Sequence, residues 1–194
     1  MRKPINYPMG SISSGTMCAE DLIPTFASEL EYRAKHDKHV RSVERRKHLK
    51  LVRDIETAME HDGNNADLDP YFESEDADYD LSDLFDALDA YSAPYFYFGS
   101  HPGNGADYGY WLSESWDEDF LGNPGLAFAL RESAQYRALH GAGDIDPMPP
   151  AIKVSDLSEV PSWFRGEVAV VNDHGNVTLY VKTSRALREI WSVV

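Results

Sequence analysis

Apolar residues in the first half of the chain recur at intervals of three and four, which predicts amphipathic helices. One helix is expected over 17–35, with Thr16 as its N-cap. Pro24 is expected in its first turn or at the start of the helix proper, because an interior proline breaks a helix. A second is expected over 37–61, with an apolar face and Lys and Arg around the rest. A third, short helix over about 80–91 carries Asp at every third position on its expected outward side.

The second half of the chain contains short runs of β-branched and aromatic residues, which are typical of β-strands. Residues 94–113 and 166–183 each have the pattern of a hairpin, and 187–194 that of a last strand. Between the hairpins, 125–141 has a helical pattern and 144–152 is a Pro-rich connector. The sequence therefore predicts an α+β fold, with N-terminal helices followed by an antiparallel sheet built from C-terminal hairpins.

Size and composition favour a single domain over residues 1–194. The chain has 194 residues, of which 42% are hydrophobic, and this is enough for one core. No run of eighteen apolar residues occurs, so neither a membrane span nor a membrane partner is expected. The first residues lack the apolar segment of a secretory signal and Cys18 is the only cysteine, so the expected compartment is a reducing cytoplasm.

The net charge of −15 is concentrated in the middle of the chain. Residues 61–150 hold nineteen Asp and Glu against two Lys and Arg, a net of −17, whereas 1–60 has a net of +2 and 151–194 a net of zero. No Lys or Arg occurs between Arg53 and Arg131. Because a field of this sign repels nucleic acid and attracts basic surfaces, the acidic region is not expected to bind nucleic acid directly.

The sequence assigns no catalytic residue, metal or cofactor. A calcium loop of the EF-hand type needs Gly at its sixth position and Glu at its twelfth, but a loop that begins at Asp76 has Leu81 and Ala87 there. A loop that begins at Asp62 has Ala66 in place of a ligand. The histidines lack partners at zinc-site spacing, and no phosphate-binding, serine-hydrolase or zinc-protease motif occurs.

The stretch 73–91 is the main candidate for a binding site. It has eight carboxylates in nineteen positions and no Lys or Arg, which solubility does not require, because mixed charges serve that purpose as well. A solvated helix surface is the simpler interpretation. A spaced array of carboxylates also resembles the phosphates of a nucleic acid, and acidic residues return at 113–120. The residues expected to bind a partner are Glu73, Glu75, Asp76, Asp78, Asp80, Asp83, Asp86, Asp89, Asp117, Glu118 and Asp119.

The partner expected for such a surface is a nucleic-acid-handling protein with a basic cleft. Aromatic residues would make the contact specific, and Tyr71, Phe72 and Trp116 are the expected anchors. The basic stretch within 33–60 is interpreted as a solvated helix face that packs near the acidic block, either within the fold or between subunits. This interpretation leaves a monomer and an oligomer both open.

A glycine-rich loop over 99–109 is an alternative site of another class. Its glycines allow a ligand to approach the backbone, and His101 with Asp107 can form an acid–base pair beside Tyr108 or Tyr110. The protein would then be a small-molecule-binding protein or a small enzyme. The simpler interpretation is a loop between strands, in which the His101 and Asp107 side chains are solvated or hydrogen-bonded locally.

Three segments resemble a group of small accessory proteins encoded by tailed bacteriophages. They are "MGSISSGTMCAEDLIPTF" (9–26), "YFESEDADYDLSDLFDALDAYSAPYFYFGSHPGNGADYGYWLSE" (71–114) and "VSDLSEVPSWFRGEVAVVNDHGNVTLYV" (154–181), together with the ending "EIWSVV". The resemblance implies the cytoplasm of a bacterial host cell during infection, and it implies no residue roles. Segments at about 33–60 and 121–150 fall between the similar segments, which makes them candidates for insertions.

The resemblance also changes the expected function of an acidic protein. Phages use small acidic proteins to block restriction enzymes, CRISPR effectors and host nucleic-acid enzymes. The resemblance therefore implies a counter-defence inhibitor that acts by binding, through an acidic surface that mimics nucleic acid. A structural or assembly protein of the virus particle is the third alternative, after the inhibitor and the glycine-rich pocket.

Overall fold

The computed structural model describes residues 6–61, 70–122 and 151–193. They form two compact units, of which one is Asn6–Ser113 and the other begins at Glu114. Each unit is described by itself. The predicted helix over 125–141 lies outside the described residues, as do nearly all of the candidate insertion at 121–150 and the first part of the predicted connector.

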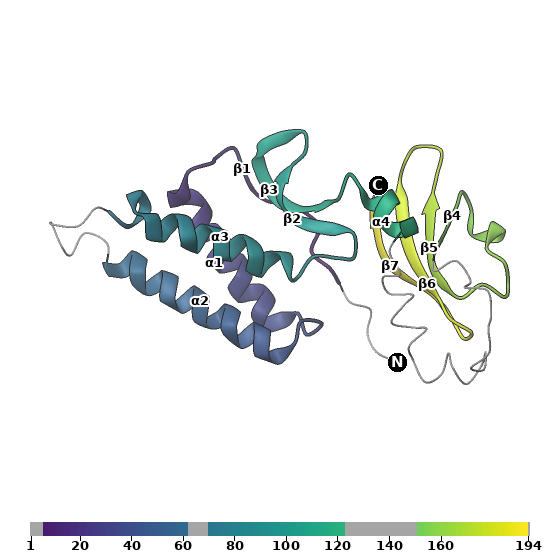
Figure 1. Ribbon diagram of the computed structural model, residues 1–194, viewed down its shortest axis with the longest axis horizontal. Helices are drawn as coiled ribbons and strands as arrows, with labels where there is room; N and C mark the ends of the chain where they lie inside the picture. Colours follow the sequence, from purple (N-terminus) through teal and green to yellow (C-terminus); the bar gives the residue numbers. More distant parts are fainter. Residues whose placement is uncertain (1–5, 62–69, 123–150, 194) are drawn as a thin grey trace. The chain divides into compact units, whose positions relative to one another are not determined.

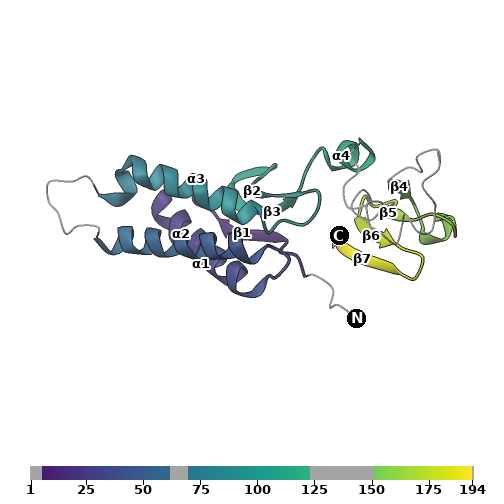
Figure 2. The ribbon, with the colours of Figure 1, turned by 60° about the horizontal axis from the view of Figure 1, so that its bottom comes forward.

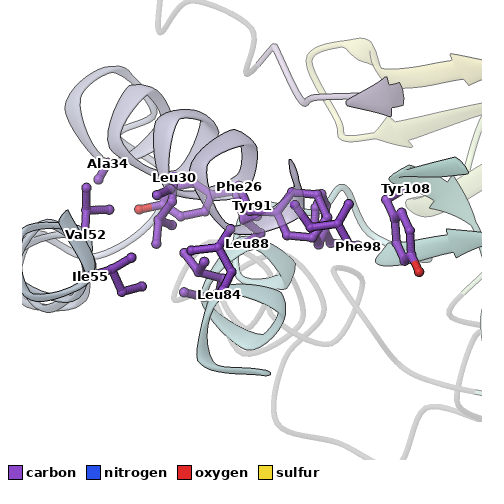
Figure 3. Packing of buried hydrophobic residues seen from close by; sticks show 14 of the residues in the cluster. Phe26, Leu30, Ala34, Val52, Ile55, Leu84, Leu88, Tyr91, Phe98 and Tyr108 are labelled. Atoms are coloured by element: carbon purple, nitrogen blue, oxygen red, sulfur yellow. The ribbon is translucent and has the colours of Figure 1, made fainter. Parts of the chain in front are cut away.

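Three helices form the body of the first unit (Figures 1 and 2). They are α1 (Ala19–His36), α2 (Ser42–His61) and α3 (Glu75–Asp89), and a short 3-10 helix, η1 (Tyr71–Glu73), precedes α3. Both α2 and α3 pack against α1. Apolar residues at helical spacing explain this arrangement, because each helix places one stripe inward: Figure 3 shows Val52 and Ile55 of α2 pointing toward Ala34 and Leu30 of α1.

A three-stranded antiparallel sheet covers one end of these helices. Its strands are β1 (Gly10–Ser14), β2 (Phe96–His101) and β3 (Asn104–Leu112), in the order β1-β3-β2. The backbones of β1 and β3 approach closely, since a Cβ on Gly109 would lie 2.1 Å from the carbonyl oxygen of Gly10. Only glycine therefore fits at position 109 of β3.

The core of this unit lies where the helices meet the sheet. The ring of Phe26 on α1 meets the ring of Phe98 at 5.0 Å and that of Tyr108 at 5.8 Å, both edge-on. Leu84 and Leu88 of α3 pack beside them and are fully buried (Figure 3). Edge-to-face pairs contribute about 0.5–1.5 kcal/mol each beyond the burial of area, so this cluster fixes α3 to both α1 and the sheet.

Three helix starts differ from the predicted ones. Helix α2 begins at Ser42, so the prediction that it begins at residue 37 was wrong. The N-cap of α1 is Cys18, so the expectation of Thr16 was wrong, and Pro24 lies inside the helix, beyond its first turn. The start of α3 is Glu75, so the prediction that this helix begins at about residue 80 was also wrong. The physical reason is Ser74, whose hydroxyl accepts a hydrogen bond from the backbone N–H of Ala77 at 3.4 Å and so caps the helix.

The second unit contains a four-stranded sheet. Its strands are β4 (Ala151–Val154), β5 (Gly166–Val171), β6 (Val177–Lys182) and β7 (Leu187–Val193), in the order β4-β5-β6-β7. Helix α4 (Trp116–Gly122) and the 3-10 helix η2 (Leu157–Glu159) belong to the same unit. Val168, Leu179 and Trp191 are buried in its sheet.

The α+β class predicted from the sequence is confirmed, with N-terminal helices, an antiparallel sheet and C-terminal hairpin strands. Two strands were not predicted. Residues 10–16 were expected to be a Gly/Ser loop, but Gly10–Ser14 form β1, which pairs with β3. Ala151 and Ile152, assigned to the Pro-rich connector, begin β4, which pairs in parallel with β5. A four-residue strand next to prolines has too little pattern to be recognised, and its pairing partner makes it a strand. The single domain over 1–194, with insertions at about 33–60 and 121–150, stays a prediction.

Candidate partner-binding face

The outward side of α3 is acidic along its whole length. Successive residues of a helix are about 100° apart, so the exposed positions of α3 fill one continuous arc. This arc lies opposite the buried residues Ala77, Leu84 and Leu88. Its members are Glu75, Asp76, Asp78, Tyr79, Ser82, Asp83, Asp86 and Asp89. We call the six carboxylates of this arc the α3 acidic face.

Among the residues that the structure describes, no cation compensates the α3 acidic face. Within the described part of the chain, none of its six carboxylates forms an ion pair. Asp83, Asp86 and Asp89 follow one another at spacings of three, and like charges at this spacing each cost about 0.2–0.5 kcal/mol. The last two also lie near the negative end of the helix dipole. Glu75, Asp76 and Asp78 in the first turn are favoured by the dipole, so only the second half of the face reduces the stability of the helix.

Asp89 combines exposure with a structural role. Its Oδ1 accepts a hydrogen bond from the backbone N–H of Phe98 at 2.9 Å and another from the hydroxyl of Ser92 at 3.2 Å. The first of these bonds ties the start of β2 to the end of α3. Asp89 is therefore the one member of the α3 acidic face whose carboxylate also holds the fold together.

Asp80 lies apart from the α3 acidic face. Its carboxylate is half-buried and accepts a hydrogen bond from the hydroxyl of Tyr71 at 2.7 Å. Burial raises the pKa of Asp80 above its usual value, and the charges of Asp83, Asp76 and Asp54 add to the rise, while the Tyr71 hydrogen bond opposes it. The structure thus places this predicted partner-binding residue in the packing between η1 and α3.

The aromatic anchors expected from the sequence are in poor positions to meet a partner. Tyr71 is buried, and Phe72 is half-buried with its ring 5.0 Å from that of Tyr71. Trp116 belongs to the second unit, where it lies half-buried against Lys153 and Phe120. None of the three stands on the α3 acidic face.

Tyr79 has the position that was expected of those residues. It is 68% exposed and lies between Glu75 and Asp76 on one side and Asp83 and Asp86 on the other along the same arc of α3. Tyr79 was not predicted as an anchor, because the helix was expected to begin at about residue 80. The available signal was the capping serine at position 74, which extends the helix to include Tyr79.

The remaining predicted acids are in two other places. Glu73 is exposed on η1, just before α3. Asp117, Glu118 and Asp119 are in α4, in the second unit. There Asp117 forms an ion pair with Lys153, with Oδ2 and Nζ 2.6 Å apart, and Asp119 accepts a hydrogen bond from the hydroxyl of Ser115. These three acids therefore form no part of the α3 acidic face.

The structure does not gather the four residues of the alternative pocket at one site. Tyr108 and Tyr110 are buried on the sheet face that meets the helices, and burial raises the pKa of the Tyr110 phenol well above its usual value. Asp107, one residue away in β3, points to the other face, where the hydroxyl of Ser11 donates to its Oδ1 at 2.5 Å. His101 accepts from the backbone N–H of Gly103, so Asp107 and His101 each have a separate local partner. The hydroxyl of Tyr110 is buried and has no hydrogen-bond partner among the described residues.

Other classes of site can be compared with the described residues. Among them, no group of His, Cys, Asp or Glu side chains is arranged to hold a metal ion. None of the helices in the described ranges is both long and apolar enough to cross a membrane. In the described part of the chain, the α3 acidic face is therefore the candidate site that the arrangement of side chains supports.

Comparison with protein-family models, with curated proteins and with solved structures gives no match to this chain. The resemblance to phage accessory proteins stays a prediction.

Proposed function

We propose that the protein acts by binding, and that the α3 acidic face imitates a nucleic acid and occupies the basic nucleic-acid-binding cleft of another protein. One observation carries this proposal: six exposed carboxylates without an ion-pair partner in the described residues form one continuous arc on a single helix. No chemistry is needed, because each carboxylate is one contact among several.

The spacing of the charges supports the proposal. From Glu75 to Asp89 the helix axis rises about 21 Å, at 1.5 Å per residue. Six carboxylates that span this length are on average about 4.2 Å apart along the axis, which is of the same order as the 3.4 Å per phosphate of one DNA strand. A cleft whose Lys and Arg match the phosphates of a strand can therefore match this helix as well.

Tyr79 supplies a contact that charge alone does not. A guanidinium group stacks on a tyrosine ring, and carboxylates accept its hydrogen bonds in pairs. Tyr79 has acidic residues on both sides along α3, so an arginine of the partner can stack on the ring and reach a carboxylate at once. Lysine has a compact ammonium group and gains less from a ring, so arginine is the preferred partner residue.

The resemblance to phage accessory proteins supports a particular class of target. For a protein of that kind, the proposed targets are host defence proteins of the restriction or CRISPR type, which hold DNA or RNA in basic clefts. Blocking such a cleft would make the protein a counter-defence inhibitor.

Charge reversal on α3 tests the proposal. In the first variant Asp76, Asp83 and Asp86 are changed to Lys, and in a matched control Glu20, Glu56 and Asp173, which are exposed elsewhere, are changed to Lys. Binding of a labelled nona-arginine peptide is measured by fluorescence anisotropy at low salt. We expect the first variant to lose at least tenfold in affinity and the control less than threefold. Equal losses would show that net charge matters and the face does not, and the proposal would fail.

The contribution of Tyr79 is tested with two peptides of equal charge. The wild-type protein should bind nona-arginine more tightly than nona-lysine, by a factor of about 2–30 if the stacking contributes 0.5–2 kcal/mol. Tyr79→Leu should reduce the preference to what the paired hydrogen bonds of the carboxylates provide, and Tyr79→Phe should keep it. An unchanged preference in Tyr79→Leu would exclude the ring contact while leaving the role of the charges intact.

A further inference from the structure

A cluster of polar rings lies where α1 passes into α2, away from the α3 acidic face. Nδ1 of His48, on α2, lies 2.9 Å from the hydroxyl of Tyr91, which follows the end of α3. The ring of His39, in the connection between α1 and α2, meets the ring of Tyr91 edge-on at 6.0 Å. On its other side His39 meets the ring of Tyr7 at 5.0 Å, in the N-terminal segment. Four separate parts of the unit therefore meet at these rings.

The surroundings of the two histidines disfavour a positive charge on either ring. Both histidines are half-buried and Tyr91 is fully buried. Nε2 of His39 is buried and has no hydrogen-bond partner among the described residues. On the neutral ring this nitrogen is an acceptor without a donor, but on the protonated ring it would be a charged donor without an acceptor. A buried unpaired charge is far more costly than a buried unpaired lone pair.

Charged groups face the histidines from each element that packs on them. From α1 come Arg33 and, just after its end, Asp37, which act on His39 in opposite directions. From α2, Glu44 favours and Lys47 disfavours a charge on His48. Arg45 also lies here, with Nη1 donating to the carbonyl oxygen of Ala34 at 3.1 Å. A hydrogen bond with the Tyr91 backbone also favours the charged ring of His39, but burial is the largest influence on both histidines and lowers the pKa of each.

We propose that His39 and His48 form an acid-sensitive latch, which holds α2 and the N-terminal segment against the end of α3 while both rings are neutral and releases them when the rings are protonated. The latch is independent of the α3 acidic face and of any partner. It makes the junction of α1 and α2 the first part of this unit to open on mild acidification.

The direction of the pH effect follows from the burial of the rings. Burial lowers the pKa of His39 and of His48 below the usual 6.5 in the folded protein, whereas both return to about 6.5 when the junction opens. The open form therefore binds more protons between the two values. The stability that the neutral rings provide is fully present above pH 6.5 and is lost as the pH falls through the folded pKa.

Hydrogen exchange at pH 7.5 and pH 5.5 tests the latch. Protection factors of the amides in 37–48 are obtained after division by the intrinsic exchange rate at each pH. One histidine with a sufficiently lowered pKa can reduce protection by about tenfold over this range, because a full unit of pH below 6.5 corresponds to that factor. We expect protection in 37–48 to fall about tenfold or more, while that of strands β5 and β6 in the second unit falls much less.

Two variants make the result decisive. His39→Phe keeps an aromatic ring and His48→Gln keeps an acceptor for the Tyr91 hydroxyl, so the double variant lacks only the protonation. Its protection in 37–48 should be the same at both pH values, even where the absolute protection is lower than in the wild type. In the matched control His36→Gln, which changes an exposed histidine of α1, the fall should be that of the wild type. The latch is excluded if the wild type shows no fall or the double variant shows the same fall.

Discussion

Helices α2 and α3 pack against the same helix, α1, yet they carry their charges in different ways. On α2 and just before it, Glu44 pairs with both Arg41 and Lys47, and Lys50 pairs with Asp54. On α3 no carboxylate of the acidic face has such a partner within the described residues. The two helices are alike in that each buries an apolar face against α1. They differ in their exposed charges, which form ion pairs on α2 and, within the described residues, none on the α3 acidic face.

The difference shows which charges serve the fold. Ion pairs at spacings of three and four stabilise a helix by about 0.3–0.5 kcal/mol each, so the charges of α2 support α2 itself. The charges of α3 repel one another, and those in its last turn oppose the helix dipole. The acids of the first turn are favoured by the dipole, but Asp83 and Asp86 in the second half do not stabilise the helix. These acids call for an explanation outside the helix, and binding to a basic partner provides one.

The largest effects on stability should come from substitutions in the buried faces of the two helices. Ile55 of α2 and Leu84 of α3 are both fully buried, so Ile55→Ala and Leu84→Ala should each lower the free energy of unfolding by about 2–5 kcal/mol. Urea denaturation followed by circular dichroism measures both. A loss below about 1 kcal/mol for one of the two would show that its helix contributes little to the core. The two helices would then differ in their buried faces as well as in their exposed charges.

A comparison of Asp89 with Asp86 tests whether one carboxylate of the α3 acidic face has a structural role that another lacks. Asp89→Ala leaves the backbone N–H of Phe98 without its acceptor and should cost about 1–3 kcal/mol. Asp86→Ala removes one of several like charges and should leave stability unchanged or raise it by about 0.5 kcal/mol. The same urea titration compares them. Equal effects would contradict the role assigned to Asp89.

Charge reversal should act in opposite directions on the two outer faces. Glu44→Lys breaks two ion pairs near the start of α2 and should lower the free energy of unfolding by about 0.5–1 kcal/mol. Asp86→Lys meets Asp83 and Asp89 at spacings of three and should raise it by about 0.5 kcal/mol. Thermal unfolding at low salt detects both shifts. At 0.5 M salt both should shrink, since exposed charges are then screened.

Asp80 should give a pH dependence that is small and of defined sign. Because its folded pKa is raised, the stability it contributes is present below its unfolded pKa and is lost as the pH rises through the folded value. The wild type should therefore gain stability relative to Asp80→Asn when the pH falls from 6.5 to 4. Tyr71→Phe removes the hydrogen bond that favours the charged form, so the gain should become larger in that background. A difference between wild type and Asp80→Asn that stays constant with pH would contradict the burial of this carboxylate.

Local pattern was enough to predict much of the fold. The apolar spacing of the helices, the alternation in 166–183 and the turn residues at its centre specify elements that need no distant partner to be recognised. Where the pattern was short, prediction failed: β4 has four residues and is defined by its parallel pairing with β5. The start of α3 was missed for another reason, since one serine side chain decides it.

By itself, the sequence determined the α+β class, the concentration of acid in the middle of the chain and the absence of any cation between Arg53 and Arg131. It presented the eight carboxylates of 73–91 as equivalent, because spacing along a chain carries no information about burial. Only the tertiary structure separated them: Asp80 packs against η1, Asp89 accepts a hydrogen bond from the Phe98 amide and Glu73 lies on η1, before α3. The other five remain in the solvent-facing arc around Tyr79. Net charge is fixed by composition, but a binding face depends on which charges the core leaves outside.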